Sequence, residues 1–181
     1  MLADANGGWS LCAALVAAQC LADLPVRLER PCRTMSDCVQ LRRTTHLPIV
    51  LDEVVLTLED LAYGKQFVGA RGLDIKPSRI GGLTKARLLR DATQALGKTF
   101  TVDDTWGGSL VTAQIAAVAA NASAGHLKAV TSFATLTDRP SASVPTRSST
   151  ASRSCQTAPS LELEIDASLL GDAILDTVRQ R

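Results

Sequence analysis

The sequence predicts an α/β fold in which strands and helices alternate to form part of a (β/α) TIM-type barrel. Short apolar runs of strand length recur at intervals of about 25 residues over the first 132 positions. Segments rich in Ala and Leu, long enough for helices, lie between several of them. Charged side chains stand at the ends of most of these runs. Because the carboxyl ends of parallel strands meet on one face of a barrel, these side chains are expected to gather there.

The first two units are predicted from apolar runs and capping residues. Residues 1–4 form a short apolar run that ends in an acid, and a Gly-Gly loop then leads into an Ala- and Leu-rich helix at 9–22. A second run of strand length occupies 24–29. Thr34 is expected to begin a helix at 34–44, because a threonine hydroxyl can accept a hydrogen bond from the first helical turn, and Ser36 and Asp37 could also cap it.

The middle of the chain continues the alternation. An apolar strand is expected at 48–52 and a helix at 57–68. A further strand is expected at 72–76, and a pair of glycines separates it from a helix at 83–96. That helix has an apolar residue at every third or fourth position, the spacing of one buried helix face.

The last predicted unit comprises a strand at 98–103, an Ala-rich helix at 109–123 and a strand at 127–132. Strands that alternate with helices imply a parallel sheet with helices on its faces. A closed barrel of this kind has eight strands and about 250 residues, whereas this chain has 181. We therefore expect the carboxyl-terminal part of a larger barrel that lacks the first strands.

The composition divides the chain into three segments. Residues 1–137 form the partial barrel domain, and residues 138–160 are dominated by Ser, Thr, Pro, Ala and Arg. Such a composition buries too little apolar surface to offset the entropy of ordering, so a loop or disorder is expected there. In the tail at 161–181, the alternation at 161–165 predicts a short strand followed by a turn.

Overall composition argues against several classes of partner. The net charge is +1 and aromatic residues make up 3%, which disfavours binding to nucleic acid or to an anionic membrane. The sequence shows neither a membrane span nor a signal peptide, so a cytoplasmic enzyme is expected. The five cysteines match no zinc or disulfide pattern, and Cys12 and Cys20 are expected to be buried on the helix at 9–22.

Three acids stand at the ends of successive predicted strands. Asp4, Glu29 and Asp52 would meet at one face of the barrel, where carboxylate oxygens suit a hard divalent cation such as Mg²⁺. Without a cation, three neighbouring carboxylates would repel one another. Any one of them alone is more commonly a helix cap or a solvated loop charge, so the prediction depends on all three together.

Lys76 and Asp104 end the next two strands and are the candidate catalytic residues. A divalent cation beside Lys76 would favour its neutral amine, which could take or return a proton on the carbon next to a metal-bound carboxylate. Asp104 precedes a Gly-Gly turn. It could bond to Lys76, contact the substrate or serve as a turn residue, since an acid three residues before glycine is common turn chemistry.

The motifs around these residues resemble the barrel domain of the enolase superfamily, in its mandelate racemase and muconate lactonizing enzyme branch. Their order and spacing extend over residues 1 to about 133. The matching segments are Asp4-Ala5-Asn6-Gly7-Gly8-Trp9, Leu28-Glu29-Arg30-Pro31-Cys32, Leu51-Asp52-Glu53, Lys76-Pro77-Ser78-Arg79-Ile80-Gly81-Gly82 and Asp104-Thr105-Trp106-Gly107-Gly108.

The resemblance implies that Asp4, Glu29 and Asp52 hold Mg²⁺ and that Lys76 is an acid/base for a proton next to a carboxylate. Within this branch, the Glu-x-Pro-Cys and Asp-Thr-Trp-Gly-Gly segments imply a dehydratase acting on cis-3-hydroxy-L-proline. Racemisation or epimerisation of an amino acid or a proline betaine is the alternative. The resemblance further implies a small carboxylate substrate and, for the full-length family, a homo-oligomer.

The sequence also departs from the family pattern. No segment resembles the capping domain that precedes the barrel, nor the Lys-x-Lys strand that supplies a second lysine. Arg30 stands where glutamine is usual, and the resemblance is lost between about residue 134 and Leu161. A truncated, non-catalytic remnant is therefore a third expectation for the chain.

Overall fold

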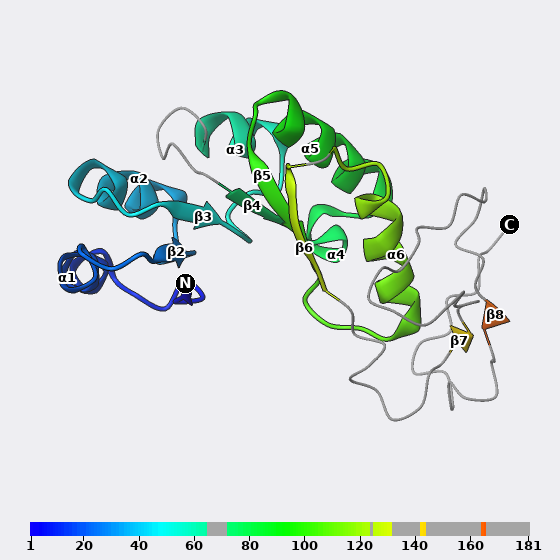
Figure 1. Ribbon diagram of the computed structural model, residues 1–181, viewed down its shortest axis with the longest axis horizontal. Coiled ribbons are helices and arrows are strands. Elements are labelled where there is room, and N and C mark those ends of the chain that lie inside the picture. Colours follow the sequence, from blue (N-terminus) through cyan, green and yellow to red (C-terminus); the bar gives the residue numbers. More distant parts are fainter. Residues whose placement is uncertain (65–71, 124, 132–141, 144–163, 166–181) are drawn as a thin grey trace, which may run out of the picture.

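The computed structural model describes residues 1–64, 72–123, 125–131, 142–143 and 164–165 (Figure 1). Six strands form one sheet in the order β1-β2-β3-β4-β5-β6, and every pair of neighbours is parallel. The sheet curls as part of a barrel, which confirms the predicted fold class. The strands are β1 (Leu2–Asp4), β2 (Arg27–Glu29), β3 (Ile49–Leu51), β4 (Gly72–Ile75), β5 (Thr99–Val102) and β6 (Leu127–Val130).

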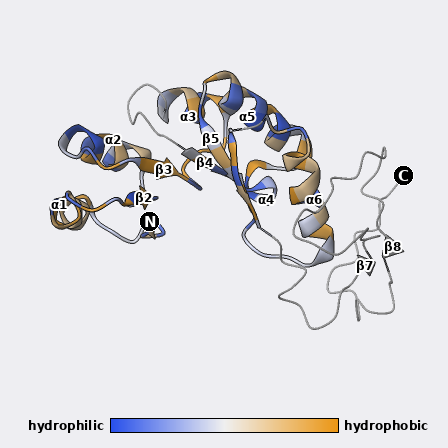
Figure 2. Ribbon diagram, viewed as in Figure 1, coloured by the Kyte–Doolittle hydropathy of each residue, from blue (hydrophilic) through white to orange (hydrophobic). Residues whose placement is uncertain are grey.

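Helices connect the strands, as the alternation in the sequence predicts. Figure 2 shows apolar residues through much of α1 and α6, whereas α2 and α5 carry more polar residues. Each of the first five strands is followed by at least one helix before the next strand. The helices are α1 (Leu11–Cys20), α2 (Met35–Thr44), α3 (Leu58–Tyr63), α4 (Pro77–Ile80), α5 (Leu83–Ala95) and α6 (Ser109–Ala119).

Short polar side chains fix where three of these helices begin. Ser10 and Thr34 accept hydrogen bonds from the backbone N–H groups three residues later, at 3.3 and 3.1 Å. Thr57 forms a reciprocal capping box with Asp60. Each bond satisfies an amide that has no partner within the helix. The predicted start at Thr34 is confirmed.

The core lies between the sheet and the helices. Strand side chains alternate between the two faces, and the face covered by helices buries Leu28, Leu51, Leu73, Ile75 and Phe100 completely or nearly so. The alternate positions at the strand ends point to the other face, the inside of the curled sheet. Acids at these positions are therefore directed away from the apolar core.

Two details of the fold differ from the sequence-based expectation. Helix α4 was not predicted; Pro77 occupies its first position, where a missing N–H costs nothing. Cys12 and Cys20 are exposed rather than buried. They lie with Val16 at four-residue spacing along α1, on the side opposite the buried Ala14 and Ala18. Composition showed that α1 is apolar, but not which side would face the core.

Beyond the sheet, the structure describes a two-residue strand β7 (Ala142–Ser143) that pairs antiparallel with β8 (Glu164–Ile165). The rest of the predicted strand at 161–165 lies outside the described residues, as does most of the segment at 138–160. The division into three segments stays a prediction. In the described part of the chain, no helix is long and apolar enough to cross a bilayer.

Candidate active site at the strand ends

The carboxyl ends of the strands carry the side chains that the sequence singled out. Asp4 and Glu29 end β1 and β2 and are direct partners in the sheet register. Asp52 and Lys76 follow β3 and β4 immediately. A cavity of about 420 Å³ opens at this end of the sheet. Its lining residues are Asp4, Asn6, Asp52, Glu53, Lys76, Arg79, Asp103, Asp104, Thr105, Trp106 and Thr131.

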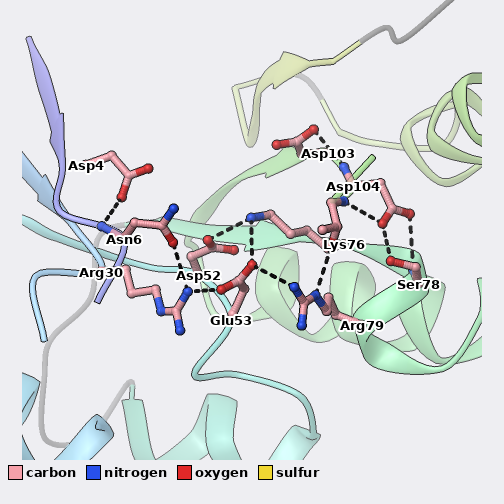
Figure 3. A network of polar contacts seen from close by, with 11 residues as sticks. Asp4, Asn6, Arg30, Asp52, Glu53, Lys76, Ser78, Arg79, Asp103 and Asp104 are labelled. Carbon is pink, nitrogen blue, oxygen red and sulfur yellow. Dashed lines mark hydrogen bonds and ion pairs between the residues drawn. The ribbon is translucent and has the colours of Figure 1, made fainter. Parts of the chain in front are cut away.

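Lys76 and Asp52 form the central contact of this cavity (Figure 3). Lys76 Nζ donates a hydrogen bond to Asp52 Oδ2 at 2.8 Å. Asp52 is only 3% exposed, and its other oxygen, Oδ1, is buried without a hydrogen-bond partner. Burial raises the pKa of Asp52, while the bond to Lys76 and the charges of Lys76 and Arg30 oppose that rise. A buried, unpartnered carboxylate oxygen is costly unless something binds it.

Glu29 is almost fully buried among other carboxyl groups. Its pKa is raised to about 8, first by burial and then by Asp74, Asp4 and Asp52. The pKa of Asp74 is raised as well, again mainly by burial. These groups thus face one another closely enough for each negative charge to disfavour the next.

Asp74 is a residue that sequence reasoning missed. It is hydrogen-bonded to Glu29 and to Thr101, its register partner on β5. One signal was present in the sequence: Asp74 precedes Lys76 by two residues, so the two side chains share a face of the strand.

Asp4 has a more open position. It is exposed, and its Oδ1 accepts a hydrogen bond from the backbone N–H of Asn6 at 2.7 Å. This bond holds the Asp4 carboxylate at the start of the loop after β1 and leaves its other oxygen toward the cavity side of the site (Figure 3).

The donor set fits a hard cation by its chemistry, although the side chains are not gathered into a finished cage. Within the described residues, no three His, Cys, Asp or Glu side chains are close enough to hold an ion as they stand. Asp52 Oδ1 lacks a partner, and burial together with the neighbouring carboxylates raises the pKa of Glu29; a bound cation would relieve both. Asp4, Glu29 and Asp52 are the residues that would hold it, and their role stays a prediction.

Asp104 has a different set of partners from Lys76. It is 3% exposed, and it accepts hydrogen bonds from the hydroxyl and the backbone N–H of Ser78 and from the backbone N–H of Thr105. These bonds join the end of β5 to the start of α4. Asp104 lines the cavity, whereas Lys76 forms its ion pairs with Asp52 and Glu53. A catalytic role for Asp104 stays a prediction.

Glu53 and two arginines form a second group that sequence reasoning did not assign. Glu53 pairs with Arg30 and lies near Lys76 and Arg79. Arg30 also donates to Asn6 Oδ1 at 3.1 Å and has a left-handed backbone, with φ at 35°. In the sequence, Glu53 directly follows Asp52. Because side chains alternate between the two faces of a strand, this position alone would place Glu53 on the face opposite Asp52.

Mg²⁺ affinity is expected to rise with pH and to level off above about pH 8. The raised pKa of Glu29 keeps a proton on the folded chain, and a cation held by Glu29 would have to displace this proton. Below this pKa, affinity should change by about tenfold per pH unit. The same shift should make the metal-free chain less stable as pH rises from about 4.5 to about 8. Isothermal titration calorimetry between about pH 6 and pH 9 measures the affinity; a flat profile would contradict the expectation.

Comparison with known proteins identifies the family. A family model described as enolase C-terminal domain-like matches residues 1–166. The chain belongs to this family. The resemblance to the enolase superfamily inferred from its motifs is thereby confirmed.

The relatives of this enolase C-terminal domain-like chain are enzymes. Over 119 residues it is 43% identical to cis-3-hydroxy-L-proline dehydratase of Roseibium aggregatum, covering 66% of this chain and 32% of that enzyme. Over 87 residues it is 41% identical to o-succinylbenzoate synthase of Mycobacterium tuberculosis, covering 45% of this chain and 26% of that enzyme. The chain thus spans only about a quarter to a third of the length of these curated relatives.

Solved structures show the same fold. A mandelate racemase/muconate lactonizing enzyme from Roseovarius nubinhibens superposes with a TM-score of 0.87 at 30% identity, covering 96% of this chain and 47% of that one. A structure from the same organism, complexed with magnesium, gives a TM-score of 0.86 at 28% identity, with the same coverage of both chains. The chain corresponds to about half of each of these proteins.

Proposed function

We propose that this chain carries the metal and acid/base residues of a Mg²⁺-dependent dehydratase acting on cis-3-hydroxy-L-proline. The observation that carries the proposal is the pairing of Lys76 with a buried Asp52 that keeps one oxygen unpartnered at a polar cavity. The 43% identity to the dehydratase of Roseibium aggregatum supports the choice of substrate. A magnesium-bound structural neighbour supports the choice of metal.

The chemistry divides between the cation and the side chains. Bound Mg²⁺ would supply positive charge to the substrate carboxylate, which makes the adjacent C–H bond more acidic. Asp4, Glu29 and Asp52 would hold it. The Lys76 amine takes the proton from the α-carbon, and the electron pair of that bond forms a double bond to C3 as the C3–O bond breaks. The hydroxyl leaves as water when it receives a proton, and the ring product rearranges to a cyclic imine.

Two other outcomes follow from the same residues. Epimerisation requires a second proton donor on the opposite face of the α-carbon, and Lys76 is the one lysine among the described residues that line the cavity. A non-catalytic remnant would bind metal without turnover. A small carboxylate substrate, a homo-oligomer in the full-length family and a cytoplasmic location remain part of the proposal.

The deciding experiment incubates the purified 181-residue chain with cis-3-hydroxy-L-proline in D₂O, with Mg²⁺ or with a chelator. A second arm adds the part of the Roseibium aggregatum enzyme that lies outside the matched residues. Mg²⁺-dependent loss of water, detected as the cyclic imine, is expected in the second arm. Deuterium at the α-carbon without loss of water would favour epimerisation. A folded, metal-bound chain that is inert in both arms would be the remnant.

A further inference from the structure

Glu53 lies among three cationic side chains at the mouth of the cavity. Its carboxylate pairs with Arg30, and Oε1 lies 3.5 Å from Lys76 Nζ and 3.6 Å from the Arg79 guanidinium. Figure 3 shows the four side chains converging from different segments. Arg30 follows β2, Glu53 follows β3, Lys76 follows β4 and Arg79 belongs to α4. Glu53 thus connects the ends of three neighbouring strands.

These contacts differ in how strongly solvent screens them. The side chains of Glu53, Lys76 and Arg30 are 15%, 14% and 19% exposed, whereas that of Arg79 is 49% exposed. Exposed ion pairs contribute little, while removing one member of a poorly exposed pair leaves a charge without compensation. The contacts of Glu53 with Lys76 and Arg30 are therefore the ones that matter for its position.

A cation bound by Asp52 would weaken the hold of Asp52 on Lys76. Its Oδ2 accepts the hydrogen bond from Lys76, and its Oδ1 is the oxygen without a partner. A divalent cation bound by Asp52 would partly neutralise the negative charge of its carboxylate. It would also repel the nearby ammonium group of Lys76. Glu53 would then be the anion beside Lys76 that the cation does not engage.

We propose that Glu53 is a positioning residue that keeps the Lys76 amine beside Asp52 when a divalent cation is bound. It acts by pairing directly with Lys76, and its pair with Arg30 fixes the carboxylate in place. The inference rests on the proposed function only in placing a cation at Asp52. It assigns Glu53 no contact with the substrate or the metal.

The test measures Lys76 directly rather than turnover. In protein labelled with ¹⁵N-lysine, nuclear magnetic resonance gives the rate at which the Lys76 ammonium protons exchange with water, and Lys76→Met assigns the signal. With Mg²⁺ bound, Glu53→Gln is expected to speed this exchange by about tenfold or more, because the glutamine oxygen carries no negative charge to assist the hydrogen bond from Lys76. The control Glu59→Gln makes the same change at an exposed position of α3 and should have no effect. An unchanged exchange rate in Mg²⁺-bound Glu53→Gln would overturn the proposal.

A second comparison separates this proposal from the metal site. Asp52→Asn removes the charge of Asp52 in metal-free protein, as a bound cation would do in the wild-type chain. Adding Glu53→Gln to Asp52→Asn should therefore speed the exchange of the Lys76 ammonium protons without Mg²⁺. If the wild-type chain binds no Mg²⁺, the proposed function fails while this comparison still decides the role of Glu53. If Glu53→Gln does not fold, because Arg30 loses its anionic partner, the double variant Arg30→Gln/Glu53→Gln takes its place. The same acceleration is expected there, and its absence would overturn the proposal.

Discussion

Replacing Lys76 with methionine should lower Mg²⁺-dependent exchange of the substrate α-proton by about 10²–10⁴-fold, the usual contribution of a positioned acid or base. Methionine keeps much of the length of lysine but cannot accept a proton. Mg²⁺ affinity should be kept or increased, because an ammonium group 2.8 Å from Asp52 Oδ2 no longer competes with the cation. Deuterium incorporation is measured by mass spectrometry and Mg²⁺ binding by calorimetry.

The matched control for this variant is Lys85→Met. Lys85 is exposed in the first turn of α5, so the same chemical change should leave both exchange and metal binding at their wild-type values. The test uses whichever mixture shows exchange with the wild-type chain, either the chain alone or the chain with the added part of the Roseibium aggregatum enzyme. If Lys76→Met exchanges the α-proton at the wild-type rate there, Lys76 is not the group that moves the proton.

Asp52→Asn is expected to weaken Mg²⁺ binding by more than about 100-fold. Replacing a residue that only supports a metal ligand costs roughly 10–100-fold in affinity, and loss of a ligand itself should cost more. The amide has nearly the same shape but removes a negative charge from a nearly fully buried position. It also takes from Lys76 its nearest anionic partner. Proton exchange should fall with metal occupancy, and excess Mg²⁺ should restore part of it.

The control Asp23→Asn changes an exposed acid in the turn after α1 and should leave Mg²⁺ affinity unchanged. Circular dichroism checks that both variants are folded. If folded Asp52→Asn binds Mg²⁺ as tightly as the wild-type chain, then Asp52 is not a ligand and the site as described is wrong.

Much of the fold was available from the sequence because the signals are local. An apolar run such as Ile49–Leu51 has the length of a buried strand, and a threonine such as Thr34 caps the helix that follows it. Helix α4 was missed because its four residues give no periodic pattern. The orientation of α1 was missed because apolar residues lie on every side of it, so Cys12 and Cys20 could not be placed.

Sequence patterns predicted only part of the candidate site. They placed four side chains at one end of the sheet, because each stands where a predicted strand ends: Asp4, Glu29, Asp52 and Lys76. It left several possibilities for Asp104, whose carboxylate in the structure bonds to Ser78 and Thr105. A contact between residues 26 positions apart depends on how β4 and β5 lie beside each other.

The sequence by itself determined the alternation of strands and helices, the family and the set of charged residues at the strand ends. It did so because helix and strand periods, caps and motif spacing act within a few residues along the chain. Only the tertiary structure decided that Lys76 bonds to Asp52, that Asp74 faces Glu29 and that Glu53 joins two arginines to the lysine. Those contacts depend on the curl and register of the sheet, which arise from packing across the whole domain.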